Sequence, residues 1–229
     1  MGQFTTLTAA DGFEVSAYVA EPAGRPRGAV VVLQEIFGVN AHICSVVDRF
    51  AAEGYLAVAP ATFDRVKTGV ELGYGEDDMK AGFALKTAVE ALPGAGVLQD
   101  IEAAIAHAAQ ASGGKVGIVG FCWGGLLTWR AACLLPGLSA AVPYYGGGMT
   151  TEDEAARQPR CPVLAHFGDQ DHWISLESIE AFQKAHPEVQ VQVYPAHHGF
   201  NCDQRGAYDA DAATLARERT LAFLADKLA

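Results

Sequence analysis

The chain has 229 residues, of which 50% are hydrophobic, so it is long enough to bury a substantial core as one domain. Its 16 basic and 27 acidic residues give a formal charge of −11, and no cluster of lysine and arginine offers an electrostatic footprint for nucleic acid or an anionic membrane. No apolar stretch approaches the ~20 residues that cross a bilayer, and the first residues lack the basic and apolar regions of a secretory signal.

The secondary structure is predicted from the apolar pattern along the chain. Residues 4–7 and 13–19 alternate apolar with polar side chains around Asp11-Gly12, which predicts an antiparallel hairpin. From Ala29 onward, continuously apolar strand candidates alternate with helical patterns, as in a parallel sheet buried on both faces. The later strands are expected at 29–33, 55–59, 115–119, 139–145, 162–167 and 189–194, and the helices at 40–53, 79–91, 97–109, 123–134, 174–185 and 208–228.

These elements predict an α/β fold in which a mostly parallel, twisted sheet of about eight strands carries helices on both faces. The chain contains no internal repeat, no low-complexity tract and no linker long enough to divide it. We therefore expect residues 1–229 to form a single domain that begins with an antiparallel hairpin and has no separate cap domain.

The sequence around Cys122 is the most informative for function. An apolar strand candidate runs into Gly120-Phe121-Cys122-Trp123-Gly124-Gly125 and continues as a helical pattern. Glycines on both sides of the cysteine permit the sharp strand-to-helix turn of a nucleophile elbow, which is normally built around serine. A cysteine at a strand end is commonly a small buried apolar residue, but these glycines favour a nucleophile.

Other reactive side chains follow later strands. In open parallel sheets, chemistry collects at the carboxyl ends of the strands. Asp169 and Asp171 follow the next-to-last expected strand, and His197 and His198 follow the last one. The order nucleophile, acid, base is the order found in α/β-hydrolases. The aspartates could instead form a turn or cap a helix, and the histidines could lie in a solvated loop, so these residues alone do not choose within either pair.

The chemistry of a cysteine nucleophile sets further requirements. A nearby imidazolium favours the thiolate, and a carboxylate orients the imidazole. Backbone N–H groups must stabilise the oxyanion, and we expect them at Ile36 and Trp123. Glu35 follows a buried strand, so its carboxylate is predicted to be functional and not simply solvated.

At the level of motifs, the sequence resembles the dienelactone hydrolase family (carboxymethylenebutenolidases) of α/β-hydrolases. The resemblance runs from Gln34 to the helix that contains Glu218-Arg219-Thr220. The matching pieces are Gln34-Glu35-Ile36-Phe37-Gly38-Val39-Asn40, Asp100-Ile101-Glu102-Ala103-Ala104-Ile105, Gly117-Ile118-Val119-Gly120-Phe121-Cys122-Trp123-Gly124-Gly125, Tyr144-Tyr145-Gly146, Gln170-Asp171-His172-Trp173 and His198-Gly199-Phe200.

The resemblance implies roles for individual residues. The family's acid precedes His-aromatic and its histidine precedes a small residue and Phe, which implies a catalytic triad of Cys122, Asp171 and His198. The resemblance also implies that Glu35 holds the resting cysteine as a thiol until substrate displaces it. Such gating would protect the thiol from oxidation, because the thiolate is the vulnerable form.

The residues for substrate binding depart from the family pattern. Family members resemble one another in binding a lactone carboxylate through two arginines, one before the helix that leads toward Asp100 and one shortly after the catalytic histidine. Here the first region, 76–80, has no arginine, and Cys202 stands at the second position. Lys80 and Arg205 are the candidate substitutes. Aromatic candidates for the pocket wall are Phe37, Tyr144, Tyr145, Trp173 and Phe200.

We therefore expect a cysteine-nucleophile hydrolase of small carboxylic esters or enol-lactones that works through a thioacyl-enzyme. One alternative is a thioesterase or broader carboxylesterase that uses the same triad, with the glycine-rich segment 61–78 as a lid. A second alternative, from another class, is a non-catalytic hydrolase-fold protein that acts as a thiol redox sensor or interaction module.

The expected partners follow from this function. A small-molecule ester or lactone is expected as substrate, without nucleic acid or membrane, and the protein is expected to be a monomer or small homo-oligomer. No cofactor or metal is expected, because the adjacent His197 and His198 cannot both face one ion as histidines at i and i+4 do. Five scattered cysteines without Cys-x-x-Cys spacing argue against a disulfide framework and predict a cytoplasmic protein.

Overall fold

The predicted sheet is present in the computed structural model, which describes residues 1–229. It is an 8-stranded sheet in the order β1-β2-β4-β3-β5-β6-β7-β8. The β1–β2 and β2–β4 pairs are antiparallel, and all the other pairs are parallel. The strands are β1 Gln3–Thr8, β2 Glu14–Ala20, β3 Ala29–Leu33, β4 Leu56–Pro60, β5 Val116–Phe121, β6 Leu138–Tyr144, β7 Leu164–Gly168 and β8 Gln190–Tyr194.

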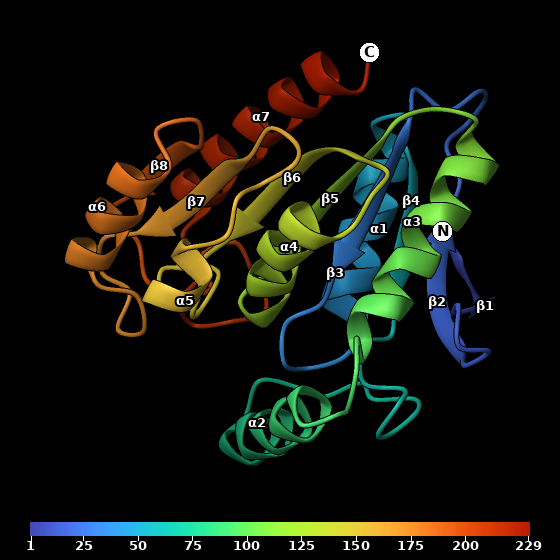
Figure 1. Ribbon diagram of the computed structural model, residues 1–229, viewed down its shortest axis with the longest axis horizontal. Coiled ribbons are helices and arrows are strands. Elements are labelled where there is room, and N and C mark those ends of the chain that lie inside the picture. The colour runs from blue at the N-terminus through green and yellow to red at the C-terminus, as the bar shows by residue number, and fades with distance from the viewer.

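Helices cover both faces of the sheet (Figure 1). On one face, Trp129 of α4 packs edge-on against Phe182 of α6, with 5.0 Å between the ring centroids, and α3 lies beside α4. On the other face lie α1 and α7, which are joined by an ion pair between Glu53 and Arg217. The helices are α1 Ala41–Ala52, α2 Glu76–Glu90, α3 Val97–Ser112, α4 Trp123–Leu134, α5 Glu152–Ala155, α6 Leu176–Ala185 and α7 Ala210–Lys227.

The central strands are apolar because both of their faces are covered. Every residue of β3 and β5 is buried. The edge strand β1 exposes all but one of its residues, and only Tyr194 of β8 is buried. The prediction of a mostly parallel sheet with helices on both faces and an N-terminal antiparallel hairpin is confirmed; the arrangement is that of the α/β-hydrolases.

Helix α2 lies beyond the carboxyl ends of the strands, apart from the two helix layers (Figure 1). It begins at Glu76, three residues before the predicted start at 79. The earlier start has a local cause, since the Asp78 carboxylate accepts a hydrogen bond from the Gly75 N–H at 3.2 Å, and acidic residues in a first turn suit the helix dipole. The preceding loop is held against the turn after β3, where the Leu72 N–H donates to the Phe37 carbonyl at 2.8 Å.

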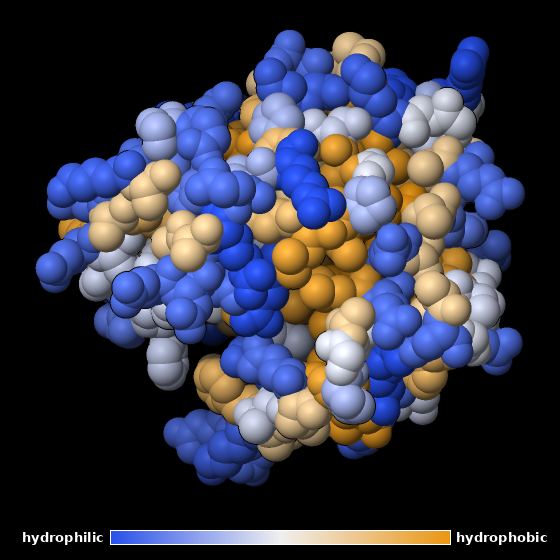
Figure 2. All heavy atoms as spheres, viewed as in Figure 1, coloured by the Kyte–Doolittle hydropathy of each residue, from blue (hydrophilic) through white to orange (hydrophobic).

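The surface is mostly polar. Figure 2 shows one concentration of apolar atoms on the face that carries α3 and α4. A groove between these helices is lined by apolar side chains, among them Val97, Leu98, Leu127 and Leu134. None of the helices combines the length and the apolar character needed to cross a membrane.

Candidate active site

Cys122 occupies the turn between β5 and α4. Its backbone has φ 56° and ψ −118°, a conformation that residues other than glycine rarely adopt. The flanking glycines let the chain pack closely around it. A Cβ on Gly120 would lie 2.1 Å from the Gly124 carbonyl oxygen, and one on Gly124 would lie 2.4 Å from the Gln34 carbonyl oxygen. The expected strand-to-helix elbow is therefore formed, with α4 pressed against the end of β3.

An imidazole and a carboxylate are aligned beside this turn. The Nδ1 atom of His198, after β8, lies 2.7 Å from Oδ2 of Asp171, which follows β7. The other carboxylate oxygen of Asp171 accepts the Trp173 N–H at 2.8 Å, so both oxygens are fixed. With Nδ1 bonded to Asp171, Nε2 is the ring nitrogen left for Cys122, which lines the same cavity as His198.

The surroundings of His198 favour its charged form. Burial alone would lower the pKa of this histidine, since a charged imidazolium is poorly solvated in the interior. The negative charge of a Cys122 thiolate and the hydrogen-bonded Asp171 carboxylate outweigh burial and raise the pKa of His198 to about 10. At neutral pH, His198 is then an imidazolium placed between a carboxylate and a sulfur atom.

Asp169 and His197, the alternatives to Asp171 and His198 in the sequence pattern, do not take part in this arrangement. Asp169 is exposed, and its N–H bonds to the Tyr194 carbonyl. His197 is also exposed, with its Nδ1 2.9 Å from the Gln170 carbonyl oxygen. The structure therefore brings together Cys122 and the pair that the family resemblance selects.

Two residues of the cavity wall have a backbone N–H group that bonds to no backbone carbonyl. Trp123 is the first residue of α4, where an N–H has no partner within the helix. The N–H of Ile36, in the turn after β3, donates to no other backbone group of the chain. Both residues line the cavity that contains Cys122. This arrangement provides two donors of the kind that stabilises an oxyanion.

Glu35 is almost completely buried, and its partner is an arginine. Its Oε1 atom accepts a hydrogen bond from Nη1 of Arg205 at 2.9 Å, whereas Oε2 has no partner. The Arg205 guanidinium also lies over the rings of Phe37 and Tyr74. The resting contact with Cys122 that the family resemblance implies is absent from this structure, because the carboxylate is directed to Arg205.

The cavity above Cys122 has a volume of about 290 Å³. It is bounded by the turn after β3, the elbow, α2 and the loops after β6, β7 and β8. Trp173, an expected pocket residue, contributes to its wall although most of its surface is exposed. The lining residues are Ile36, Phe83, Lys86, Cys122, Trp123, Gly147, Gly148, Trp173 and His198.

Other residues expected in the pocket wall lie elsewhere. Lys80, in the first turns of α2, is 74% exposed, pairs with Asp77 at the surface and does not line the cavity. Tyr144 ends β6 with its hydroxyl 2.6 Å from the Thr220 hydroxyl of α7, so it belongs to the core.

Four more of the expected pocket residues are packed behind the cavity. Phe37 and Phe200 are fully buried, and Arg205 is held by Glu35. Tyr145 is also buried, with its ring edge-on to His198 at 5.1 Å between centroids. These residues support the wall of the cavity without forming it.

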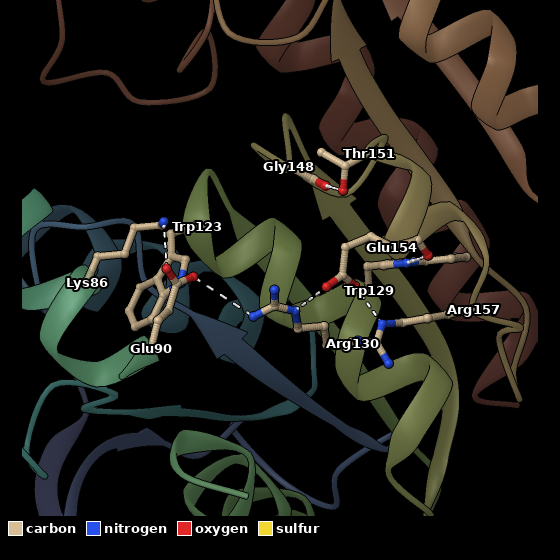
Figure 3. A network of polar contacts seen from close by, with 9 residues as sticks. All are labelled: Lys86, Glu90, Trp123, Trp129, Arg130, Gly148, Thr151, Glu154 and Arg157. Carbon is tan, nitrogen blue, oxygen red and sulfur yellow. Dashed lines mark hydrogen bonds and ion pairs between the residues drawn. The ribbon is translucent and has the colours of Figure 1, made fainter. Parts of the chain in front are cut away.

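Four lining residues were not predicted from the sequence, namely Phe83, Lys86, Gly147 and Gly148, and Lys86 is the charged one among them. Its Nζ atom lies 2.9 Å from Oε2 of Glu90, whose Oε1 atom accepts the Trp123 indole N–H at 3.1 Å (Figure 3). Arg130 continues the network from Glu90 at 3.9 Å to Glu154 at 2.8 Å. The i,i+4 spacing of Lys86 and Glu90 predicts that the two side chains share one face of a helix. It does not predict that this face lines the cavity.

The chain is similar in sequence to known proteins along nearly its whole length. The model of the dienelactone hydrolase family matches residues 15–228. The carboxymethylenebutenolidase of Pseudomonas putida is 37% identical over 222 residues, covering 94% of this chain and 92% of that protein. A putative carboxymethylenebutenolidase of Synechocystis sp. is 37% identical over 223 residues, covering 90% and 89% of the two chains.

The structural comparison gives the same result. The crystal structure of a putative dienelactone hydrolase from Klebsiella pneumoniae superposes with a TM-score of 0.84 at 32% identity, and the match covers 98% of both chains. The similarity in sequence and in fold thus extends over nearly the whole molecule. The chain belongs to the dienelactone hydrolase family.

Proposed function

We propose that this protein hydrolyses small carboxylic esters or enol-lactones, with Cys122 as the nucleophile of a thioacyl-enzyme. The observation that carries the proposal is the alignment of Asp171 and His198 beside Cys122, at the floor of a small cavity with two backbone N–H donors. Membership of the dienelactone hydrolase family supports ester or lactone hydrolysis as the reaction class.

Acylation starts from the thiolate of Cys122 and the imidazolium of His198. The sulfur attacks the carbonyl carbon, a C–S bond forms, and the negative charge moves to the carbonyl oxygen. The N–H groups of Ile36 and Trp123 stabilise this oxyanion. When the C–O bond breaks, His198 gives its proton to the departing alkoxide or enolate oxygen, and Asp171 keeps the ring oriented.

Deacylation reverses these roles with water. His198 is now neutral and takes a proton from a water molecule as that water attacks the thioacyl carbon. The C–S bond then breaks, which releases the carboxylic acid and returns the sulfur as a thiolate. The proton that His198 took restores the imidazolium, so each cycle consumes one water and no cofactor.

Glu35 is proposed to control when the thiolate forms. In the arrangement seen here, its carboxylate is paired with Arg205 and Cys122 is left to His198. In the proposed resting arrangement the Glu35 carboxylate turns toward Cys122 and accepts a hydrogen bond from its thiol, which keeps the thiol protonated. The unpartnered Oε2 atom gives Glu35 an oxygen that is free to accept that hydrogen bond.

The cavity supports a small substrate. Its volume of about 290 Å³ is at the lower end of ligand pockets, which span roughly 300–1,000 Å³, and leaves little room for a long acyl chain. Lys86 is the cationic side chain in its wall and is proposed to attract a substrate carboxylate. A reducing cytoplasm is the proposed compartment, since all five cysteines are free thiols.

Hydrolysis of p-nitrophenyl acetate tests the proposed nucleophile and base. Cys122→Ala is expected to abolish turnover, whereas Cys161→Ala, at a buried cysteine far along the chain, should leave kcat nearly unchanged. His198→Asn should lower kcat by about 10³-fold or more, and His197→Asn by less than about twofold. Full activity of the folded Cys122→Ala variant, or equal losses from the two histidine variants, would refute the proposal.

A second assay tests the substrate class. The kcat/KM values for cis- and trans-dienelactone are compared with those for neutral lactones and aryl esters. If Lys86 attracts the carboxylate, Lys86→Met should raise KM for the dienelactones and leave neutral esters unaffected, and the surface variant Lys80→Met should change neither. Loss of kcat/KM for charged and neutral substrates alike would contradict this role.

A further inference from the structure

A second group of reactive side chains lies outside the proposed triad. Glu35, His42 and Cys202 come from the turn after β3, the start of α1 and the loop after β8. One ligand atom from each residue lies within 4.8 Å of the other two. The relative exposures of the three residues are 1%, 0% and 0%, so the group is enclosed by protein.

Two atoms of this group have no hydrogen-bond partner. Oε2 of Glu35 and Nε2 of His42 are both buried and unsatisfied. A buried polar atom without a partner is unfavourable, and native proteins usually supply one from the chain, from water or from an ion. Both residues belong to the group that includes the Cys202 sulfur, so an ion bound among the three would give these buried atoms a partner.

Two of the three side chains are also held in place by a further residue. Nδ1 of His42 lies 3.1 Å from Oδ1 of Asp203, which fixes the tautomer that leaves Nε2 as an acceptor. Arg205 binds the other carboxylate oxygen of Glu35 at 2.9 Å. Carboxylate–histidine pairs and bonded ligand atoms of this kind surround metal ions in proteins.

We propose that Glu35, His42 and Cys202 form a binding site for Zn²⁺, with one oxygen, one nitrogen and one sulfur ligand. Zinc binds these three atom types, and a water molecule supplies the fourth position of a tetrahedral site. The Cys202 thiol loses its proton to solvent when the Zn–S bond forms. The Cys202 thiolate and the carboxylates of Glu35 and Asp203 then balance the charges of Zn²⁺ and Arg205. The site is separate from the proposed nucleophile and adds no step to hydrolysis.

The proposed zinc site shares Glu35 with the proposed gate. A Zn²⁺ ion on Oε2 would keep the carboxylate away from Cys122 while Oε1 stays on Arg205. The zinc site itself depends only on the geometry of the three ligands. Its test therefore measures metal binding directly, and its outcome is independent of whether the protein hydrolyses esters.

The affinity for Zn²⁺ is measured by competition with a chromophoric chelator. Cys202→Ser and His42→Asn are expected to weaken binding at least about tenfold, and Asp203→Asn about 10- to 100-fold through the orientation of His42. His197→Asn serves as the matched control, because His197 and His172 form an exposed pair that could also hold metal, and it should leave the affinity unchanged. Equal affinities in the wild type and Cys202→Ser would overturn the proposal.

Cobalt(II) gives a readout that does not depend on removing a ligand. The Cys122→Ser variant removes the thiolate of the proposed triad, so any thiolate-to-cobalt charge-transfer band in that variant must come from another cysteine. The band is expected to persist there and to vanish in Cys122→Ser/Cys202→Ser. Absence of the band in the folded Cys122→Ser variant would show that Cys202 does not bind the metal and would overturn the proposal.

Discussion

The buried ion pair between Glu35 and Arg205 predicts how much stability is lost when one partner is replaced. The Glu35 side chain is 1% exposed and that of Arg205 is 15% exposed, so removal of the arginine leaves a carboxylate charge with no route to solvent. Breaking such a pair by replacing one partner typically destabilises a protein by about 3–5 kcal/mol. Because Arg205 is slightly exposed, we expect Arg205→Met to lower the free energy of unfolding by about 3 kcal/mol.

Replacement of both partners should be much milder. In Glu35→Gln/Arg205→Met no charge is buried, and methionine keeps the apolar stem that packs over Phe37 and Tyr74. We expect the double variant to lie within about 1 kcal/mol of the wild type, as buried pairs replaced by uncharged groups often do. The matched control is Arg217→Met, which breaks an ion pair with partners 44% and 39% exposed and should change stability by less than about 1 kcal/mol.

Urea unfolding followed by circular dichroism measures all four proteins at one pH. The expected result is a large loss for Arg205→Met, its partial recovery in the double variant, and little change for Arg217→Met. If Arg205→Met and Arg217→Met were equally stable, burial would not be the source of the effect. A double variant as unstable as Arg205→Met would show that the arginine acts through packing and not through charge.

Gly124→Ala should lower the free energy of unfolding by about 3 kcal/mol or more, because the new Cβ would lie 2.4 Å from the Gln34 carbonyl oxygen. The control is Gly147→Ala, whose Cβ would have no atom within 4 Å and which should lower the free energy of unfolding by less than about 0.5 kcal/mol. Equal urea midpoints for the two variants would refute this prediction. Burial lowers the pKa of His166 to about 3, so this histidine stays neutral in the fold but takes up a proton below about pH 6.5 when unfolded. Its contribution is therefore present above pH 6.5 and lost as pH falls toward 3, which amounts to roughly 2 kcal/mol at pH 5. His166→Gln should remove that part of the decline between pH 7 and pH 5, and an unchanged decline in urea titrations would contradict the assignment.

Much of the fold could be predicted because local patterns and tertiary packing agree. The bounds expected for β3 and α4, at 29–33 and 123–134, match the structure. The four-residue helix α5 escaped prediction, because so short a segment has no apolar period to read. The early start of α2 depended on a single side chain, Asp78, which bonds back to the chain.

The site was less accessible from the sequence, for reasons of distance and orientation. The elbow is a local motif, and Cys122 could be recognised from its neighbours. The partnership of Glu35 with Arg205 joins loops 170 residues apart and depends on how the loop after β8 folds back. Lys86 was missed and Lys80 preferred because both lie on α2, and only the docking of that helix decides which lysine faces the cavity.

The order of these loops along the chain determines when Cys122 can meet its proposed partners during synthesis. Cys122 leaves the ribosome well before His198 and Arg205, which lie in the loop after β8, and β8 pairs only with β7 at the edge of the sheet. A nascent chain that ends before this strand has the elbow but neither the imidazole beside the sulfur nor the arginine opposite Glu35. The proposed partnership of Cys122 with His198 can therefore form only when β8 and the loop after it have joined the nearly finished sheet.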